Sequence, residues 1–376
     1  MTQKKKLIVI LVALILITTN VEAMDNITKA RKLRVNAVSF IAMDAQSGMI
    51  LCENNSKKIL AMASTTKILT CLIAIEYCKP DEIVTVSSNA ATTYGSKVHL
   101  KSGEKIKVEE LLYGLMLKSG NDAAVALAEH IGGNVENFSR IMNDYAFKLG
   151  LLSSNFKSPH GLDKQNHYST SYDLAKATSI ALKNETFRNI VKCKQISANE
   201  KGFNRSYVNI NKILHRLPNA TGVKTGYTGN AGKCLVSSFR YMDRDIVIVT
   251  LNCPNRWNET VKIAEYVKAN YEVKKLYGKG DILGEVKAEN SCDKSKLICG
   301  NDVIIPVRKG LSPEITIKIP KEGLMAPLKQ GCRVGSIEIS YENNKLYEQP
   351  LVLQSKITKH SKLKIFIKDK FSGKEK

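Results

Sequence analysis

The chain has 376 residues, of which 43% are hydrophobic, so it can build a core, and its length predicts two or three domains. Wholesale disorder is excluded, and because no apolar run reaches about 20 residues, so is a protein that crosses the membrane several times. The formal net charge of +22 indicates polyanionic surroundings such as nucleic acid, anionic lipid or an anionic cell wall.

The first 23 residues have the pattern of a signal peptide. Three lysines at positions 4–6 precede an apolar run over 7–17, and Val21-Glu22-Ala23 offers small residues for cleavage after Ala23. An uncleaved membrane anchor is the alternative. Both interpretations export the rest of the chain, which argues against nucleic acid as a partner and favours lipid headgroups or wall polymers.

The nine cysteines cannot all pair within one chain, because their number is odd. Cys71 and Cys78 lie in an apolar helical stretch, where we expect buried thiols. Cys292 and Cys299 lie in what reads as a polar loop and are the candidates for a local disulfide. The sequence contains neither Cys-x-x-Cys nor His-Glu-x-x-His, so we predict no metal site.

The elements expected over residues 35–276 predict an α+β domain, with helices packed on an antiparallel sheet. A hairpin comes first, helices follow, and a strand meander with a terminal helix ends the domain near Tyr277. The expected strands are 37–43, 49–53, 223–227, 234–239 and 246–251, the helices are 64–77, 109–117, 122–131, 172–182 and 259–271, and a loop covers 157–171.

The remaining segments are a linker over 24–34, a small β-sandwich-like domain over 277–354 and a basic tail over 355–376. Alternating runs such as 315–319 and 337–339 predict the strands of the second domain. In the tail, Leu363, Ile367 and Phe371 are spaced i, i+4, i+8 among lysines, which predicts an amphipathic helix at an anionic membrane surface. A solvated basic tail is the alternative.

Ser64 and Lys67 are the first candidates for chemistry. The spacing i, i+3 places both side chains on one helical face, where a lysine amine that burial has made neutral can take the serine proton. Four other Ser-x-x-Lys pairs occur, at Ser102, Ser154, Ser291 and Ser361. Ser64 differs from them because it opens a helix too apolar to be exposed.

Two further motifs complete a pattern. Ser119-Gly120-Asn121 supplies a hydroxyl and an amide between two expected helices, and Lys224-Thr225-Gly226 supplies a cation, a hydroxyl and a bare backbone position on an expected strand. A Ser-x-x-Lys, a Ser-x-Asn and a Lys-Thr-Gly in this order and at these separations are typical of penicillin-recognising acyl-serine enzymes.

The chain resembles the low-molecular-weight penicillin-binding proteins of the D-alanyl-D-alanine carboxypeptidase type. The resemblance rests on the stretches 63–67, 118–124, 159–163, 167–170 and 223–229, and more loosely on 326–328 and 331–339. It implies a β-lactamase/transpeptidase-like domain followed by a small all-β domain, and removal of the terminal D-alanine from peptidoglycan stem peptides in cell-wall biogenesis. It implies β-lactam antibiotics as covalent inhibitors, no cofactor, and in many members a C-terminal helix on the outer face of the cytoplasmic membrane.

The resemblance also implies a role for each matched residue. Ser64 is expected as nucleophile, Lys67 as its base, and Asn121 as the group that orients Lys67 and the substrate amide. Ser119 and Lys224 are expected to pass the proton to the leaving amine. The expected substrate-binding residues are Lys224, Thr225 and Arg256 for the carboxylate, Gly226 for a backbone added beside the strand, and Tyr227, whose N–H joins that of Ser64 in an oxyanion hole.

Two other functions stay open. A β-lactamase shares the acylation residues but adds a glutamate for deacylation, and Glu185 with Asn189 lies too far along the chain for that arrangement, so we expect a surface helix there. A wall-binding protein that has lost turnover is the alternative from another class. His160 invites assignment as a base, but we expect it to order its loop.

Overall fold

The computed structural model describes residues 33–320, 323–341 and 344–365. The predicted signal peptide lies outside these residues, as do Ile367 and Phe371 of the predicted amphipathic tail. Within the described part of the chain, no helix has both the length and the apolar character needed to cross a membrane.

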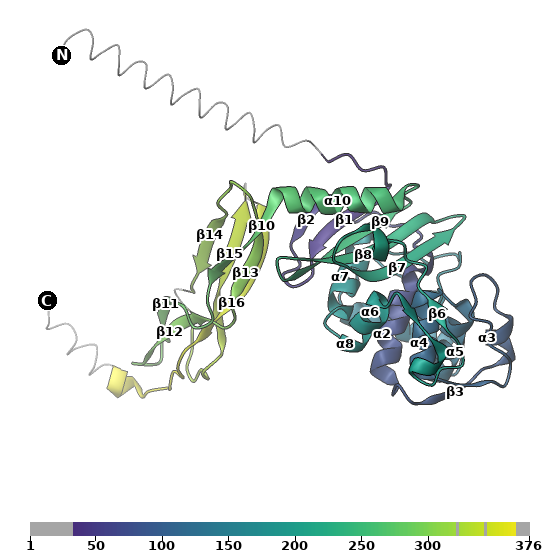
Figure 1. Ribbon diagram of the computed structural model, residues 1–376. Coiled ribbons are helices and arrows are strands. Elements are labelled where there is room, and N and C mark those ends of the chain that lie inside the picture. Colours follow the sequence, from purple (N-terminus) through teal and green to yellow (C-terminus); the bar gives the residue numbers. More distant parts are fainter. Residues whose placement is uncertain (1–32, 321–322, 342–343, 366–376) are drawn as a thin grey trace, which may run out of the picture. The chain divides into compact units, whose positions relative to one another are not determined.

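A five-stranded antiparallel sheet forms the centre of the first domain, with the order β2-β1-β9-β8-β7 (Figure 1). The predicted hairpin and meander are both present, and the central strand β9 is buried along its whole length, as its continuous apolar run requires. Pairing of β1 with β9, in which Phe40 faces Thr250, joins the two ends of the domain. The strands are β1 (Ser39–Asp44), β2 (Ile50–Asn54), β7 (Ala220–Thr228), β8 (Gly232–Tyr241) and β9 (Arg244–Leu251).

Helices cover both faces of this sheet (Figure 1). The helix α10 (Arg256–Asn270) packs on β1, β8 and β9, while α7 (Ser171–Ala181) and α8 (Glu185–Lys192) lie on the opposite side. The apolar helix α2 (Lys67–Tyr77) packs against α4, α5, α6, α7 and α8, so the prediction that it is buried is confirmed. The other helices of the domain are η1 (Ala63–Thr66), α3 (Ser88–Thr92), α4 (Val108–Leu117), α5 (Asn121–Gly132), α6 (Val135–Lys148), η2 (Ala198–Glu200) and α9 (Ile213–Arg216).

Two short ribbons that the sequence pattern did not predict lie beside the helices. One pairs β3 (Ile83–Thr85) with β4 (Lys105–Lys107), and the other pairs β5 (Gln195–Ile196) with β6 (Tyr207–Val208). With only two or three residues each, these strands are too short for an alternating pattern to stand out in the sequence.

The C-terminal region is all-β and has a core of its own, which includes Leu297, Ile337 and Leu351. A five-stranded sheet has the order β11-β12-β16-β15-β14, and β10 pairs with β13. The predicted runs 315–319 and 337–339 are paired strands in which Ile315 faces Ile339. The strands are β10 (Tyr271–Tyr277), β11 (Ile282–Lys287), β12 (Lys294–Cys299), β13 (Val303–Arg308), β14 (Glu314–Lys318), β15 (Arg333–Tyr341) and β16 (Asn344–Leu353).

The predicted disulfide between Cys292 and Cys299 is wrong. Cys299 does not lie in a polar loop but ends the strand β12, where its side chain is wholly buried in the C-terminal core. Cys292 precedes that strand, and its Sγ lies 3.8 Å from the carbonyl oxygen of Lys364. All nine cysteines belong to the described residues, and no disulfide joins any two of them.

Candidate active site

Ser64 and Lys67 meet at the junction of two helical elements. Ser64 lies in the 3₁₀ turn η1 and is half-buried, and Lys67 opens α2 with a side chain that has no exposed surface. Ala63, in the left-handed region with φ of 49°, turns the chain into this element. The lysines of the four other Ser-x-x-Lys pairs are all exposed, so burial distinguishes Lys67 from them.

Three oxygen atoms surround the Nζ of Lys67. Ser64 Oγ lies at 2.9 Å, Asn121 Oδ1 at 2.7 Å and the carbonyl oxygen of His160 at 2.7 Å. Asn121 also donates from Nδ2 to the carbonyl oxygen of Tyr94 at 2.8 Å, which directs its Oδ1 toward Lys67. The helix α2, the start of α5 and the loop 157–170 therefore meet at one amine.

Three oxygens can accept the three N–H groups of a charged lysine, and it is burial that favours the neutral amine here. The amide oxygen of Asn121 and the carbonyl oxygen of His160 can only accept, so they take the two N–H groups of a neutral lysine. The lone pair then faces Ser64 Oγ, whose hydroxyl can donate. Burial, with a further contribution from the positive charge of Lys224, lowers the pKa of Lys67 well below its usual range, although Asp122 opposes this. The structure thus places an amine of lowered pKa in contact with a hydroxyl.

Ser119 and Asn121 lie where α4 ends and α5 begins. Ser119 is 4% exposed, and its φ of 62° lies in the left-handed region, so the chain leaves the path of α4 at this residue. Gly95 permits the approach of the neighbouring loop, because a Cβ there would lie 2.7 Å from Asn121 Nδ2. The predicted inter-helix turn is confirmed.

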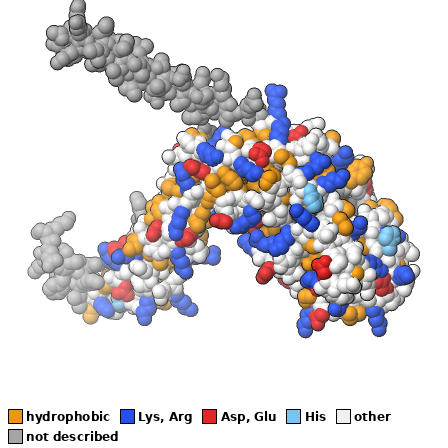
Figure 2. All heavy atoms as spheres, viewed as in Figure 1, with side chains coloured by type: hydrophobic (Ala, Val, Ile, Leu, Met, Phe, Trp, Pro, Cys, Tyr) orange, Lys and Arg blue, Asp and Glu red, His pale blue; other side chains and the backbone are white. Residues whose placement is uncertain are grey.

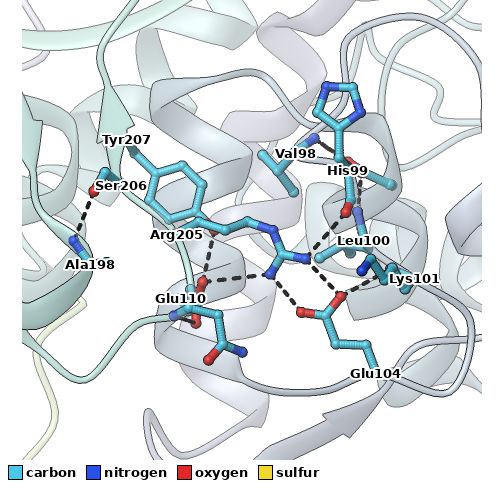
Figure 3. Close-up of polar contacts among 12 residues, drawn as sticks. Val98, His99, Leu100, Lys101, Glu104, Glu110, Ala198, Arg205, Ser206 and Tyr207 are labelled. Atoms are coloured by element: carbon cyan, nitrogen blue, oxygen red, sulfur yellow. Dashed lines mark hydrogen bonds and ion pairs between the residues drawn. The ribbon is translucent and has the colours of Figure 1, made fainter.

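Arg205, Glu104 and Glu110 form a charged cluster beside α4, the helix that precedes this turn (Figure 3). Arg205 donates to both carboxylate oxygens of Glu104, at 2.5 and 2.7 Å, and lies 3.8 Å from the buried carboxylate of Glu110 on α4. Five residues after Arg205, the N–H of Ile210 donates to the carbonyl oxygen of Leu117, the last residue of α4. The segment 204–210 therefore holds the end of α4 from outside the site.

The strand β7 carries Lys224, Thr225 and Gly226 past Ser64. A Cβ on Gly226 would lie 3.0 Å from the backbone nitrogen of Ser64 and 3.1 Å from the carbonyl oxygen of Met62, so only glycine lets the strand come this close. Lys224 is 1% exposed and donates to the carbonyl oxygen of Thr225 at 2.9 Å. Burial, followed by the charge of Arg256, lowers the pKa of Lys224 to about 7.

Arg256 and Tyr227 flank this strand. Arg256, at the start of α10, donates from one guanidinium nitrogen to the carbonyl oxygens of Gly226 at 2.5 Å and Cys234 at 3.0 Å. It therefore supports the backbone of β7 in addition to adding positive charge near Lys224. The side chain of Tyr227, the next residue along β7 after Gly226, is 66% exposed.

Two histidines have contacts that the sequence did not reveal. The ring of His160 accepts from the N–H of Leu162 at 3.1 Å, which agrees with the expected loop-ordering role, but its carbonyl oxygen also holds Lys67. His167 accepts at Nδ1 from the N–H of Lys157, and its Nε2 lies 2.9 Å from Thr66 Oγ1. Thr66 in turn donates to the carbonyl oxygen of Ala63. Burial lowers the pKa of His167 to about 4, so it is neutral at pH 7.

Glu185, the residue considered for a β-lactamase, lies away from these groups. It opens α8 and is exposed, as is Asn189, so the expectation of a surface helix is confirmed. The structure therefore brings together Ser64, Lys67 and Asn121 and passes Gly226 of β7 beside Ser64, without this glutamate, and Ser119 lies in the same turn as Asn121.

Comparisons with known proteins agree with this geometry. A family model described as D-alanyl-D-alanine carboxypeptidase matches residues 26–255, and a second, described as penicillin-binding protein 5, C-terminal domain, matches residues 271–359. D-alanyl-D-alanine carboxypeptidase DacF of Bacillus subtilis is 31% identical over 373 residues, which cover 95% of each chain. D-alanyl-D-alanine carboxypeptidase DacC of Escherichia coli is 33% identical over 86% of this chain and 84% of its own.

A solved structure of penicillin-binding protein 5 from Haemophilus influenzae superposes with a TM-score of 0.76 at 28% identity, covering 87% of this chain and 98% of its own. This likeness and the two domains described above confirm the predicted fold class. Together with the family models and relatives, they show that the chain belongs to the D-alanyl-D-alanine carboxypeptidase family, the low-molecular-weight penicillin-binding proteins, and is a serine-type peptidase.

Proposed function

We propose that this enzyme removes the terminal D-alanine from peptidoglycan stem peptides through an acyl-enzyme on Ser64. The observation that supports this most strongly is the position of the buried Lys67 amine, 2.9 Å from Ser64 Oγ, with its other contacts made to oxygens that can only accept. Family membership supports the reaction itself, a serine-type D-Ala-D-Ala carboxypeptidase activity.

In the acylation step Ser64 Oγ attacks the carbonyl carbon between the two D-alanines while its proton passes to Lys67 Nζ. The N–H groups of Ser64 and Tyr227 receive the negative charge of the tetrahedral intermediate, each such donor being worth about 3 kcal/mol in comparable sites. The C–N bond then breaks, and the proton held by Lys67 passes by way of Ser119 and Lys224 to the departing amine, which leaves Lys67 neutral for the next step. The result is an ester on Ser64 and free D-alanine.

Deacylation repeats the sequence with water. Lys67 takes a proton from water, the hydroxyl attacks the ester carbonyl, and Ser64 Oγ leaves with the proton. Asn121 supports both steps because its amide holds Lys67 on one side and can orient the substrate amide on the other.

Recognition of the substrate follows from the charges along β7. Lys224 and Thr225 would meet the carboxylate of the terminal D-alanine, and Arg256 adds positive charge from behind the strand. Gly226 lets the substrate backbone lie along β7 as an added strand. A hollow of about 510 Å³ lined by Tyr94, Ser158, His160 and Leu162 among others offers space beside the site for the rest of the stem peptide.

Export and peripheral attachment are part of the same proposal. The lysines, apolar run and small residues over 1–23 support a cleaved signal peptide, and the basic tail supports an anionic membrane surface or the cell wall as the place of action. Lys and Arg side chains are spread over the visible face of the molecule, in keeping with its charge of +22 (Figure 2). In this place the enzyme would limit cross-linking of the wall and so affect cell shape, and β-lactams would inhibit it by acylating Ser64.

D-alanine release from a synthetic peptide ending in D-Ala-D-Ala tests the proposal, with protein beginning at residue 24 and the variants Ser64→Ala and Ser102→Ala. Ser102 belongs to another Ser-x-x-Lys pair but is exposed, so it is a matched control. We expect release by the parent and by Ser102→Ala, none by Ser64→Ala, and a penicillin adduct on Ser64 in peptide mass spectra. An adduct without release would indicate a binding or transpeptidase role, rapid hydrolysis of penicillin would indicate a β-lactamase, and neither adduct nor release would refute the catalytic assignment.

A further inference from the structure

Three potential metal ligands meet on the catalytic domain away from the active site. They are the thiol of Cys78, the carboxylate of Glu82 and the imidazole of His130, and their ligand atoms all lie within 4.8 Å of one another. His130 Nε2 and Glu82 Oε1 are 2.7 Å apart. Among the residues that the structure describes, this is the one group of three such side chains that close together.

The three residues come from separate segments that the fold brings together. Cys78 caps the C-terminal end of α2, Glu82 lies in the connection to β3, and His130 lies in the last turn of α5. The backbone N–H of Lys79 donates to Glu82 Oε2 at 3.1 Å, which orients the carboxylate and directs Oε1 to the histidine. The spacing of these ligands along the chain matches none of the usual zinc-binding motifs, so the sequence does not predict the cluster.

The electrostatics of the position favour a cation. Both α2, with 11 residues, and α5, with 12, end here, and the carbonyl groups at a helix C-terminus carry partial negative charge. Glu82 adds a full negative charge, whereas burial and Glu82 raise the pKa of Cys78 to about 11, so the metal would have to displace the thiol proton. The sole basic side chain among the three ligands is His130, which binds metal in its neutral form.

We propose that Cys78, Glu82 and His130 bind a borderline-soft divalent cation, of which Zn²⁺ fits best. Sulfur, imidazole nitrogen and carboxylate oxygen are the three ligand types that Zn²⁺ accepts, and three protein ligands leave a fourth position for water. Metal–ligand distances of roughly 2.0–2.3 Å place tetrahedral ligand atoms about 3.6 Å apart. The side chains need to move by about 1 Å at most from the present separations, and all three are at least partly exposed and can do so.

The ion would link the C-terminal ends of two helices whose first residues lie in the candidate active site. Lys67 opens α2 and Asn121 opens α5, while Cys78 and His130 lie at the opposite ends. At 1.5 Å per residue Cys78 lies about 16 Å along α2 from Lys67 and His130 about 14 Å along α5 from Asn121, so the metal stabilises the packing of the two helices and takes no part in the reaction. The site is independent of the substrate.

Zn²⁺ binding by metal-free protein tests this, measured by competition with a chromophoric chelator in the presence of a reductant that does not bind metal. We expect one equivalent to bind, and Cys78→Ser and His130→Gln each to weaken binding by more than the 10- to 100-fold that loss of an outer-shell partner costs. Cys193→Ser, a half-buried thiol elsewhere, and His215→Gln, an exposed histidine, are matched controls that should bind as the parent does.

Two further measurements keep the test decisive if a variant folds poorly. Zn²⁺ should raise the melting temperature of the parent and both controls but not that of Cys78→Ser or His130→Gln. Co²⁺ in the parent and in Cys193→Ser should give thiolate-to-cobalt charge-transfer absorption in the near ultraviolet. Absence of that absorption in the parent, or Zn²⁺ affinity equal in Cys78→Ser and Cys193→Ser, would overturn the proposal.

Discussion

Replacing Gly226 by alanine should slow acylation of Ser64 strongly while the protein stays folded. The new Cβ would lie 3.0 Å from the backbone nitrogen of Ser64, 3.1 Å from the Cβ of Ala63 and 3.1 Å from the carbonyl oxygen of Met62. Each separation is several tenths of an ångström shorter than an ordinary contact. Either β7 or the turn with Ser64 must therefore move away from the other.

That movement separates the two N–H groups proposed for the oxyanion hole, since Ser64 lies on the turn and Tyr227 on the strand. Loss of one such donor costs about 10²–10³ in rate, and a misplacement of about 1 Å costs about 10². We therefore expect the acylation rate to fall roughly 100-fold. Overpacking costs about 1–3 kcal/mol, but the reduced freedom of the unfolded chain offsets about 0.4–1 kcal/mol of it, so the unfolding free energy should fall by about 2.6 kcal/mol at most.

The assay is stopped-flow acylation by a fluorescent penicillin, with urea unfolding of the same samples. Gly229→Ala is the matched control, because Gly229 lies just beyond β7, has no positive φ, and has open space where the new Cβ would lie, with no atom within 4 Å of it. It should acylate at the parent rate. The reasoning is refuted if Gly226→Ala acylates as fast as the parent, or if Gly229→Ala is slowed equally.

Charges in and around the site lead to three further predictions. With the pKa of Lys224 at about 7, kcat/KM for a substrate with a free carboxylate should fall as pH rises through about 7, because the lysine loses its charge, and Lys224→Arg should remove this fall from the pH profile. His167 has a pKa of about 4 in the folded protein and about 6.5 in the unfolded chain, so between these pH values the unfolded chain binds more protons. The unfolding free energy should therefore fall by about 3 kcal/mol as pH is lowered from about 6.5 to 4. Urea unfolding should show this loss in the parent and a smaller one in His167→Gln. Arg205→Ala leaves the buried carboxylate of Glu110 without its cation and should lower the unfolding free energy by about 2 kcal/mol, less than for a fully buried pair because Arg205 is partly exposed. Arg205→Ala combined with Glu110→Gln should lose less unfolding free energy than the sum of the two single variants.

Each of these has an outcome that contradicts it. A carboxylate-dependent kcat/KM that stays flat from pH 6 to 9 would show that the Lys224 charge is not needed for recognition. An equal loss of unfolding free energy between pH 6.5 and 4 in the parent and in His167→Gln would show that other groups cause the loss of stability in acid. Additive losses in the Arg205 and Glu110 double variant would show that the two side chains do not interact.

Much of the first domain could be predicted because its helices and strands have clear local sequence patterns. The apolar helix after Ser64, the loop with Pro159 and Gly161, and the continuous apolar run of β9 are strong local patterns, and each lies where it was expected. The errors were of another kind. Cys299 seemed to lie in a polar loop, but its neighbours alternate between buried and exposed along β12, and only strand pairing decides which side faces the core.

The candidate site was predictable to the extent that its residues lie in short motifs. Ser64 with Lys67, Ser119 with Asn121, and Lys224 with Gly226 can be recognised because each group shares one turn or one strand. Contacts made by backbone atoms could not be predicted in this way. The carbonyl oxygen of His160 holds Lys67, but a carbonyl belongs to every residue and so leaves no trace in the sequence.

The sequence by itself thus predicted the candidate site residues and determined which elements hold them, because local spacing and hydrophobic period depend on neighbours in the chain. Tertiary structure decided the lowered pKa of Lys67, the close passage of Gly226 by Ser64, and the meeting of Cys78 with Glu82 and His130. Each of these depends on distances between segments that are remote along the chain, and on the burial that their packing produces. Folding sets both quantities, and neither depends on local spacing.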